Sequence, residues 1–422
     1  MERLSDQSDF IRLVRQKRKV FRKMSESEKK LAFATKLFQS VKRFSFLMKL
    51  RACFYFFDSM ILFFLKKKVP EKSSKKRIGI LLLPGMGDCI IFCRLADSLK
   101  KALPSDQYEL TILSNDTHQK LLTNFFDNVQ GFPFYKMSFN PFSRVRILSR
   151  LRCFAFDELW DLNGCGECTP NIFISNAVCA AEKKVAYPGL LDYGKRKNFC
   201  PGWIKRKIYT EIVDLPVKIH LLDVFQKFFQ HVSGKTIYYG NISFPMKKPS
   251  SIPERYLVMI PCGSQQRNMW SGENFVELGK NLYLSKKLPV ILCGAESDRC
   301  GCAVIAEKLS SAGVIVINMA GRTIIDELAW VLSHADEVFT IDTGSFHLAV
   351  AVGAQTTVIA PDAVFSLYIN YPEDLGKNLR KCHSDVACKN CGNNCYFHEL
   401  KSYPCLGNLT VEHVLNNKEC DL

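Results

Sequence analysis

The sequence lacks the long apolar runs of membrane-spanning and secreted chains. Its first 19 residues carry charges throughout and contain no apolar segment, so we expect no secretory leader. The apolar stretch Ala52–Leu65 is interrupted by Asp58 and is shorter than the roughly 20 residues that span a bilayer. We therefore expect a cytoplasmic protein whose 18 cysteines are mostly reduced rather than paired in a disulfide scaffold.

Residues 78–422 lack the large positive charge that the net charge of the whole chain indicates. The formal net charge is +17, but residues 1–77 hold 22 Lys and Arg against 7 Asp and Glu. The remaining residues have a net charge of only +2. No recognisable nucleic-acid-binding module accompanies this basic arm, so we expect no nucleic-acid partner.

Basic residues flank the stretch Ala52–Leu65 on both sides. Lys42, Arg43, Lys49 and Arg51 precede it, and Lys66, Lys67 and Lys68 follow it. This pattern is typical of a helix that lies on an anionic membrane surface. We therefore expect a peripheral protein on the inner face of the cytoplasmic membrane. The alternative is a helix that packs on the body of the protein with its basic face in solvent.

After Arg77, short apolar runs alternate with helical patterns, which predicts an α/β fold with parallel sheets. We expect a basic extension over residues 1–76 and two Rossmann-like, doubly wound domains over residues 77–240 and 241–422. The Pro-rich segment Asn241–Pro253 is the expected linker. The expected strands are 78–83, 109–113, 158–161, 184–187, 256–260, 289–293, 314–318, 337–341 and 356–360. The expected helices are 88–103, 171–181, 272–285, 300–310, 324–334 and 346–352.

Two such domains facing each other form a cleft, and ligands bind beyond the carboxyl ends of the strands. The first candidate segment there is 83–88, where Gly85 and Gly87 allow a ligand to approach the backbone closely. The third glycine of a dinucleotide fingerprint is missing, because Ile90 occupies its position, which disfavours a nicotinamide oxidoreductase. Asp88 either caps the following helix or projects a proton-accepting carboxylate into the cleft.

The second candidate segment, 340–347, also joins a predicted strand to a helix. Backbone N–H groups at such a helix start suit a diphosphate without any metal. In the alternative interpretation Asp342 caps the helix and His347 is an ordinary core residue. The residues that would contact the ligand are Asp342, Thr343, Gly344, Ser345 and His347, with the N–H groups of Gly344, Ser345 and Phe346 as donors.

Two further loops follow strands of the same half. Ser264 and Arg267 lie in the first, where a small residue and a cation suit phosphate or sugar binding. Glu296 lies in the second, where its carboxylate can hold ribose or sugar hydroxyls. Either loop alone is weakly specific, because turns after strands are commonly small and polar.

The order of these motifs resembles glycosyltransferase family nine, whose best-known members are the ADP-heptose:lipopolysaccharide heptosyltransferases. The motifs are the glycine loop ending in Asp88, then PCGS with Trp270, GAE, AGRT, DTG with His347, and a late cysteine group. The resemblance extends from about Arg77 to Val414. It implies a GT-B fold and an inverting, metal-independent transfer of a sugar, with no cofactor. The implied donor is a nucleotide sugar, typically ADP-heptose, and the implied acceptor is a membrane glycolipid of the lipopolysaccharide core type.

The resemblance also implies residue roles. Asp88 matches the general base, Asp342, Thr343, Gly344 and His347 match contacts to the donor, Glu296 matches the carboxylate near the nucleoside, and Ser264 matches a small hydroxyl residue. The family usually has a lysine two residues before the tryptophan, where this chain has Asn268. Arg267 is the nearest substitute for that charge. An altered donor, or a catalytically idle sugar-nucleotide or lipid-binding homologue, therefore remains an alternative.

The late cysteine group comprises Cys382, Cys388, Cys391, Cys395 and Cys405. This density is compatible with a zinc or cluster site, but the spacing is looser than that of paired CxxC motifs. Because the transfer chemistry of the resembled family needs no metal, we expect a structural role for these thiols and no metal site.

Overall fold

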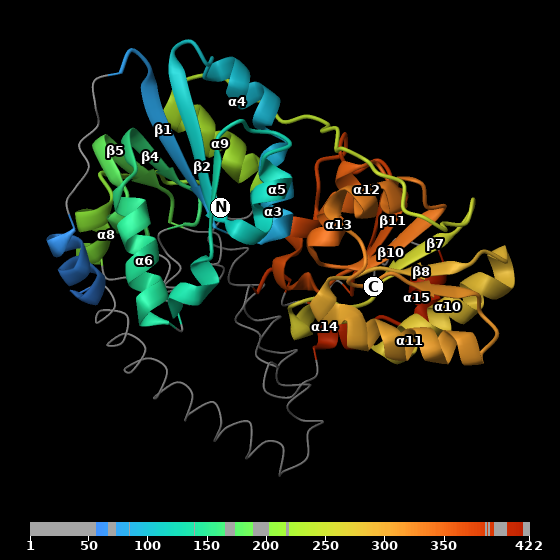
Figure 1. The fold of residues 1–422 in the computed structure, drawn as a ribbon. Coiled ribbons are helices and arrows are strands. Elements are labelled where there is room, and N and C mark those ends of the chain that lie inside the picture. The colour runs from blue at the N-terminus through green and yellow to red at the C-terminus, as the bar shows by residue number, and fades with distance from the viewer. Residues whose placement is uncertain are drawn as a thin grey trace.

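The computed structural model describes residues 56–65, 73–83, 85–138, 140–164, 174–188, 202–216, 219–384, 386, 389–391 and 403–416. Within these ranges the chain forms two six-stranded parallel sheets, each covered by helices (Figure 1). Most of the expected basic extension, including residues 1–55 and Lys66–Lys68, lies outside the described ranges. No helix in the described part of the chain is long and apolar enough to cross a membrane.

The first sheet is built from the N-terminal half of the described chain. Its strands are β1 (Lys76–Leu82), β2 (Tyr108–Asn115), β3 (Val129–Phe132), β4 (Ala155–Asp161), β5 (Cys179–Ala186) and β6 (Glu211–Ile212). The accompanying helices are α3 (Met86–Cys93), α4 (Ala96–Ala102), α5 (Asp116–Leu122), α6 (Pro141–Arg152), α7 (Ile174–Ala177), α8 (Gly202–Ile208) and α9 (Leu221–Ser233). A further helix over residues 56–64 precedes them.

The second sheet is built from the C-terminal half. Its strands are β7 (Leu257–Ile260), β8 (Val290–Leu292), β9 (Val316–Asn318), β10 (Glu337–Ile341), β11 (Thr356–Ile359) and β12 (Leu379–Cys382). Its helices are α10 (Gly272–Lys286), α11 (Arg299–Ser311), α12 (Ile325–Ser333), α13 (Gly344–Ala351), α14 (Pro404–Gly407) and α15 (Val411–Leu415). The described segment 235–256 joins the halves without helix or strand, where the linker was expected.

Both sheets have the strand order of a Rossmann fold. The first is ordered β3-β2-β1-β4-β5-β6 and the second β12-β11-β10-β7-β8-β9. The order reverses between β1 and β4 in one sheet and between β7 and β10 in the other. Ligands of open α/β sheets bind beyond the carboxyl ends of strands at such switch points. The loops after β1, β7 and β10 are therefore the places where a site is expected.

Strand β1 shows why the sheet is covered on both faces. Ile78, Ile80 and Leu82 pack into one hydrophobic cluster, whereas Leu81 packs into another on the opposite face. Alternate residues of a strand point to opposite faces, so an almost continuous apolar run belongs to a sheet buried on both. The larger cluster also contains Phe346 and Leu348 of α13, so the apolar core continues from one half of the protein into the other.

Two of the expected helices are wrong in extent. Residues 88–103 were expected as one helix but belong to α3 and α4, with a break at Arg94. The Arg94 N–H donates to the Ile91 carbonyl oxygen three residues earlier, instead of four. Residues 171–181 were expected as one helix, but α7 is short and Cys179 begins β5 by pairing with Ala155 of β4. In both places contacts with distant segments override the local helical pattern.

The Arg94 side chain, at the break between α3 and α4, connects the two halves of the protein. The buried Arg94 guanidinium donates to the Gly240 carbonyl oxygen at 3.3 Å and to the Val350 carbonyl oxygen at 3.2 Å. Gly240 lies in the connecting segment and Val350 lies on α13, so one side chain ties α3 to both. The expected continuous helix would carry this side chain away from its two acceptors.

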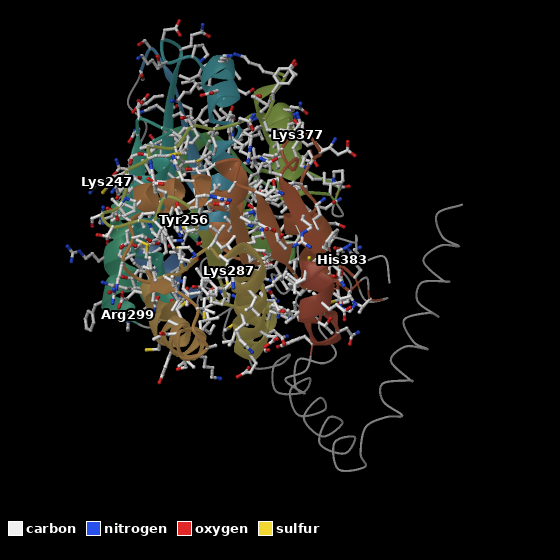
Figure 2. The ribbon with its side chains drawn as sticks, turned by 90° about the vertical axis from the view of Figure 1, so that its right-hand side faces the viewer. Lys247, Tyr256, Lys287, Arg299, Lys377 and His383 are labelled. Carbon is white, nitrogen blue, oxygen red and sulfur yellow. The ribbon has the colours of Figure 1, made fainter. Side chains whose placement is uncertain are left out.

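The side chains of the second half separate into a buried interior and a charged periphery. Figure 2 shows Tyr256 in the interior and Lys247, Lys377 and Arg299 at the edges. The Tyr256 side chain is fully buried, and its hydroxyl donates to the Val331 carbonyl oxygen at 2.9 Å. Tyr256, the residue just before β7, is thereby fixed to helix α12.

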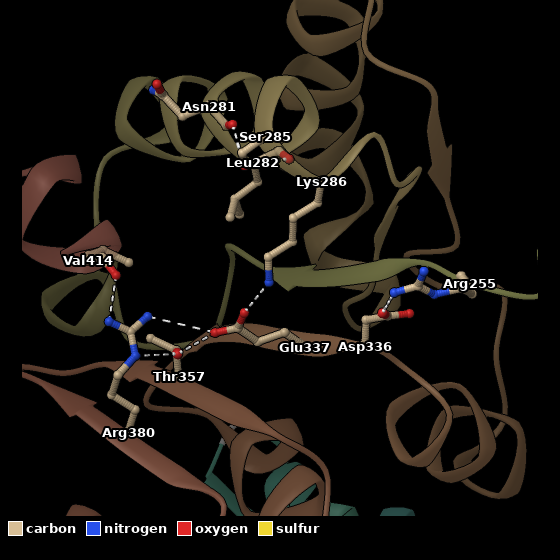
Figure 3. A network of polar contacts seen from close by, with 10 residues as sticks. All are labelled: Arg255, Asn281, Leu282, Ser285, Lys286, Asp336, Glu337, Thr357, Arg380 and Val414. Atoms are coloured by element: carbon tan, nitrogen blue, oxygen red, sulfur yellow. Dashed lines mark hydrogen bonds and ion pairs between the residues drawn. The ribbon is translucent and has the colours of Figure 1, made fainter. Parts of the chain in front are cut away.

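A polar network secures the amino ends of the strands (Figure 3). The Glu337 carboxylate, at the start of β10, accepts from Lys286 Nζ at 2.8 Å and from Thr357 Oγ1 at 3.0 Å. Arg380 of β12 donates to the same hydroxyl at 3.0 Å and to the Val414 carbonyl oxygen at 2.6 Å. These bonds tie α10, α15 and three strands together at the amino ends of the strands, opposite the carboxyl ends where a site is expected.

Candidate functional site

Asp88 lies in the first turn of α3, where the loop after β1 enters the helix. The N-terminal cap of α3 is Gly85, so Asp88 is not the cap. Its carboxylate accepts hydrogen bonds from the backbone N–H groups of Gly85 and Asp88, and Oδ1 accepts one from the Tyr368 hydroxyl at 3.1 Å. Burial raises the pKa of Asp88 to about 6, and these hydrogen bonds oppose a larger rise. Asp88 is therefore a carboxylate that can accept a proton near neutral pH.

Gly87 is required by the close approach of the two halves. A Cβ atom at this position would lie 2.4 Å from His347 Cδ2, on α13 of the other half. A Cβ atom on Gly344 would likewise lie 2.6 Å from Met86 Cε. The glycine-rich loops after β1 and β10, expected from the sequence as two separate ligand loops, thus pack directly against each other.

Asp342 follows directly after β10 and accepts hydrogen bonds from Asn268, the residue at which this chain departs from the resembled family. Asn268 Nδ2 donates to Asp342 Oδ2 at 3.0 Å and to the Asp342 carbonyl oxygen at 3.1 Å. Asp342 does not cap α13, because the cap is Thr343, without a side-chain hydrogen bond. Asn268 therefore positions the carboxylate through hydrogen bonds where a lysine would act through charge.

The charge near Asp342 comes from Arg267. Burial raises the pKa of Asp342 to about 6, the positive charge of Arg267 opposes the rise, and the negative charge of Asp88 adds to it. Asp88 thus lies close enough to Asp342 to raise the pKa of that carboxyl. That Arg267 replaces the missing lysine in contacts with a ligand stays a prediction.

Three buried polar atoms around Asp342 have no hydrogen-bond partner within the described protein. They are Arg267 Nε, Asn268 Oδ1 and Thr343 Oγ1. Gly263 allows this loop to reach Thr343, since a Cβ atom at Gly263 would lie 2.6 Å from Thr343 Cγ2. Buried polar groups are nearly always satisfied by protein, water or ligand. This cluster of donors and acceptors therefore suits a polar ligand such as a phosphate or sugar.

The helix start at α13 offers fewer free donors than the sequence suggested. The Phe346 N–H donates to the Thr343 carbonyl oxygen at 3.1 Å, so the prediction that it points at a ligand is wrong. The tight first turn of α13 closes this bond within the helix start itself. The N–H groups of Gly344 and Ser345, the first two residues of α13, remain as the expected donors to a ligand.

His347 is buried at the contact between the halves. Its Nδ1 lies 2.8 Å from the Tyr371 hydroxyl, and its ring contacts the rings of Phe346 and Tyr368. Burial lowers the pKa of His347 to about 3, so the imidazole is neutral at physiological pH. A neutral imidazole can hydrogen-bond a ligand but adds no positive charge to the site.

Ser264 and Glu296 lie further out on the second sheet. Ser264 is exposed on the loop after β7. Glu296, after β8, is exposed and pairs with Arg299 Nη1 at 3.2 Å. Gly321, after β9, packs against the Glu296 side chain, where a Cβ atom would lie 2.2 Å from Oε2. The loops after β8 and β9 thus contact each other. Among the described residues, Glu296 has no contact with Asp88 or Asp342.

Three residues that were not predicted complete the site: Tyr368, Tyr371 and His220. His220 Nδ1 accepts from the Leu222 N–H at 3.2 Å, so its Nε2 carries the proton and donates to the Tyr368 carbonyl oxygen at 3.3 Å. Its ring lies 4.3 Å from the ring of Tyr371. Tyr368 belongs to a π-helical turn over Phe365–Ile369, and such turns frequently occur at functional sites. No local sequence motif marks these residues.

The late cysteines show no metal-binding group in the described ranges. Within those ranges no cluster of three or more His, Cys, Asp or Glu side chains is placed to hold a metal ion. Cys382 and Cys405 are buried, whereas Cys388 and Cys395 lie outside the described residues.

The fold and the facing loops define a two-domain α/β protein of the GT-B class. Residues 235–360 match the family model described as glycosyltransferase family 9 (heptosyltransferase). This match confirms the family resemblance that the motifs predicted, and it supports a glycosyltransferase. A search of curated proteins finds no match to the chain.

Solved structures share the fold along most of the chain. A glycosyl transferase family 9 structure from Veillonella parvula superposes with a TM-score of 0.64 at 13% identity, covering 83% of this chain and 97% of its own. E. coli heptosyltransferase WaaC with ADP-2-deoxy-2-fluoro heptose gives a TM-score of 0.55 at 15% identity, covering 81% and 98%. E. coli ADP-heptose lps heptosyltransferase II gives 0.53 at 13% identity, covering 81% and 96%. The expected GT-B architecture is confirmed.

Proposed function

We propose that this protein is an inverting, metal-independent glycosyltransferase. It moves a sugar, with heptose the favoured one, from a nucleotide-sugar donor to a glycolipid acceptor of the lipopolysaccharide core type. ADP-heptose is the favoured donor, because the match over residues 235–360 is to a heptosyltransferase family and WaaC was solved with an ADP-heptose analogue. The segment 241–422 binds the donor and the segment 77–240 binds the acceptor. No cofactor takes part.

The observation that carries the proposal is the placement of Asp88 opposite Asp342 and the buried polar atoms around it. Asp88 comes from the first half, and unpartnered Arg267 Nε and Thr343 Oγ1 come from the second. A base on one side and ligand-binding groups on the other are what a single displacement needs. The Asp88 pKa of about 6 leaves its carboxylate mostly ionised at pH 7 and therefore able to accept a proton.

In the proposed reaction Asp88 takes the proton of an acceptor hydroxyl. The oxygen forms a bond to the anomeric carbon of the donor sugar while the bond from that carbon to the diphosphate oxygen breaks. The electron pair of the broken bond stays on the departing nucleoside diphosphate. Arg267 and the amides of Gly344 and Ser345 stabilise this developing charge, which is the role that preorganised donors have in transfer reactions. Attack from the face opposite the leaving group inverts the anomeric centre.

The first test combines binding and turnover. A thermal-shift screen with ADP, UDP, GDP and CMP and their sugar conjugates identifies the donor, because a ligand at a hundred times its Kd stabilises by about 2.7 kcal/mol. Asp88→Asn should then retain donor binding and lose transfer by about 10²–10⁴-fold. Near-normal turnover in Asp88→Asn would remove its role as base. Donor binding without transfer in the wild-type protein would instead favour a catalytically idle homologue.

The acceptor class also implies a location. A glycolipid acceptor resides in a bilayer, so we propose that the protein acts at the inner face of the cytoplasmic membrane. Co-fractionation of the full chain with inner-membrane vesicles tests this, and a protein that remains entirely in the soluble fraction contradicts it.

A further inference from the structure

The helix over residues 56–64 has two opposite faces. Asp58 and Leu62 are 0% and 5% exposed and face the first half of the protein. Phe56, Met60, Phe63 and Phe64 point away from it, with 60%, 55%, 83% and 78% of their surfaces exposed. These four residues repeat at helical spacing, so they form one stripe. Large aromatic side chains in such a stripe are unusual on a soluble surface unless something covers them.

The orientation of this stripe is fixed by buried contacts. Asp58 Oδ1 accepts from Arg144 Nε at 2.6 Å, and the Arg144 side chain on α6 is itself 1% exposed. Arg152 Nη2 donates to the Leu62 carbonyl oxygen at 3.4 Å, and Leu62 packs in the core cluster beneath α6. Turning the aromatic stripe inward would expose Leu62 and leave a buried ion pair broken, which costs several kcal/mol.

Helix α8 extends the stripe. Trp203 is 39% exposed, and its ring lies 6.1 Å from the ring of Phe56. Figure 1 shows the helix of residues 56–64 in blue beside α8, with α6 next to it. We call Phe56, Met60, Phe63, Phe64 and Trp203 the aromatic face.

The exposed charges on the three helices at the aromatic face, among the residues that the structure describes, have one sign. Arg206 and Lys207 on α8 are exposed, and Lys207 Nζ lies 5.4 Å from the centre of the Trp203 ring. Arg146 and Arg150 on α6 are also exposed. Among the described residues of these three helices, the only acid is Asp58, and it is buried against Arg144. On these three helices, within the described residues, the surface therefore combines exposed aromatic rings with positive charges and no exposed acid.

We propose that the aromatic face docks on an anionic lipid bilayer. Aromatic side chains enter the boundary between headgroups and acyl chains, and each adjacent Lys or Arg adds attraction to anionic lipids. The inference deepens the proposed function, because it assigns the membrane-contacting surface to the half that carries Asp88. A bilayer held there would present a lipid-anchored acceptor to the same half.

The test is sedimentation of the full chain with vesicles of phosphatidylcholine alone and with added phosphatidylglycerol. The paired change Phe63→Ser and Phe64→Ser should weaken binding to anionic vesicles at least about tenfold, because two exposed rings no longer enter the bilayer. Leu284→Ser is the matched control, since Leu284 is 67% exposed on α10 of the other half. This control should bind like the wild type.

A second pair of variants separates charge from apolar insertion. Arg206→Ser with Lys207→Ser should lower binding to anionic vesicles and change binding to neutral vesicles little. Donor binding in the thermal-shift screen should be unchanged in all these variants. Vesicle binding therefore tests the membrane contact even if the protein transfers no sugar. Donor binding and transfer likewise test the proposed function even if the protein does not bind vesicles.

Three outcomes would overturn the inference. Unchanged vesicle binding in the Phe63 and Phe64 pair would place the membrane contact elsewhere. A wild-type dimer that this pair dissociates would assign the face to a second copy of the chain. A fall in melting temperature in the pair but not in Leu284→Ser would mean that another part of the same chain covers the face.

Discussion

Tyr368 donates its hydroxyl hydrogen to Asp88 Oδ1 across 3.1 Å, joining residues that lie 280 positions apart in the sequence. The bond links the second half of the protein to the proposed base in the first. It favours the ionised carboxylate, whereas burial favours the neutral acid, and the resulting pKa is about 6. Tyr368 thus positions Asp88 and holds its pKa in the range useful for proton transfer.

Removing this hydrogen bond should move the pH dependence of the reaction. In Tyr368→Phe the ionised form of Asp88 loses a donor, so its pKa rises and the acidic limb of kcat/KM moves to higher pH, by up to about one unit. Turnover at pH 6 should fall more than turnover at pH 8. Tyr238→Phe, at an exposed tyrosine of the connecting segment, is the control and should leave the profile in place. An equal loss at every pH would indicate a structural role only.

Gly87→Ala should disrupt the contact between the two glycine loops. The added methyl group meets His347 Cδ2 at 2.4 Å, so either the loop or the imidazole must move. We expect a loss of about 1–3 kcal/mol in the free energy of unfolding, together with a large loss of transfer. Gly240→Ala is the matched control, because no heavy atom outside Gly240 and its two chain neighbours lies within 4 Å of the place that its methyl group would take. Urea unfolding and an initial-rate assay measure the two effects, and equal behaviour of the two variants would refute the steric argument.

Asn268→Ala should weaken donor binding. The change removes both hydrogen bonds from Nδ2 to Asp342 and leaves that carboxylate poorly satisfied. A cost of about 1–3 kcal/mol predicts roughly a tenfold to hundredfold higher Kd for the nucleotide sugar. Titration calorimetry measures the affinity, with Asn281→Ala on the outer face of α10 as control. Unchanged affinity in Asn268→Ala would show that Asn268 does not support the donor loop.

The stabilising effect of Asp342→Asn should grow between about pH 4 and pH 6 and be complete above pH 6. The folded-state pKa of Asp342 is raised from the usual 3.8 to about 6, so its neutral form favours folding below pH 4. Between about pH 4 and pH 6 the unfolded chain releases the proton that the folded carboxyl retains, so the free energy of unfolding of the wild-type protein falls, whereas Asn stays neutral and keeps an acceptor oxygen for Asn268. We expect a gain of roughly 1–3 kcal/mol at pH 8 and little difference at pH 4 in urea unfolding. A gain confined to low pH would contradict the raised pKa.

Breaking the Asp58–Arg144 pair should release the helix over residues 56–64. Both side chains are buried, so Arg144→Ala leaves an uncompensated carboxylate and should cost about 3–5 kcal/mol. Replacing both residues with leucine should cost less than either single alanine change. A double-mutant cycle measured by denaturant unfolding checks this, and additive single effects would contradict direct coupling.

The second half was predicted more closely from the sequence than the first. The expected helix 272–285 is observed as Gly272–Lys286, because Ser271 caps it by accepting from the Asn274 N–H at 3.1 Å. The expected strand 337–341 is observed unchanged as β10. Caps and apolar periods of this kind are local signals. The break at Arg94 carries no such signal, since its acceptors at Gly240 and Val350 are distant in the chain.

The local sequence was sufficient to indicate Asp88 and the segment from Asp342 to His347 as ligand loops, because glycines and acids between a strand and a helix restrict the backbone within a few residues. The tertiary structure alone decided that these loops touch, that Asn268 holds Asp342, and that Tyr368 reaches Asp88. It also decided which face of the helix over residues 56–64 is buried, through Arg144. Such relationships depend on the packing of segments that are far apart in the chain, and no spacing along the sequence encodes a distance across two domains.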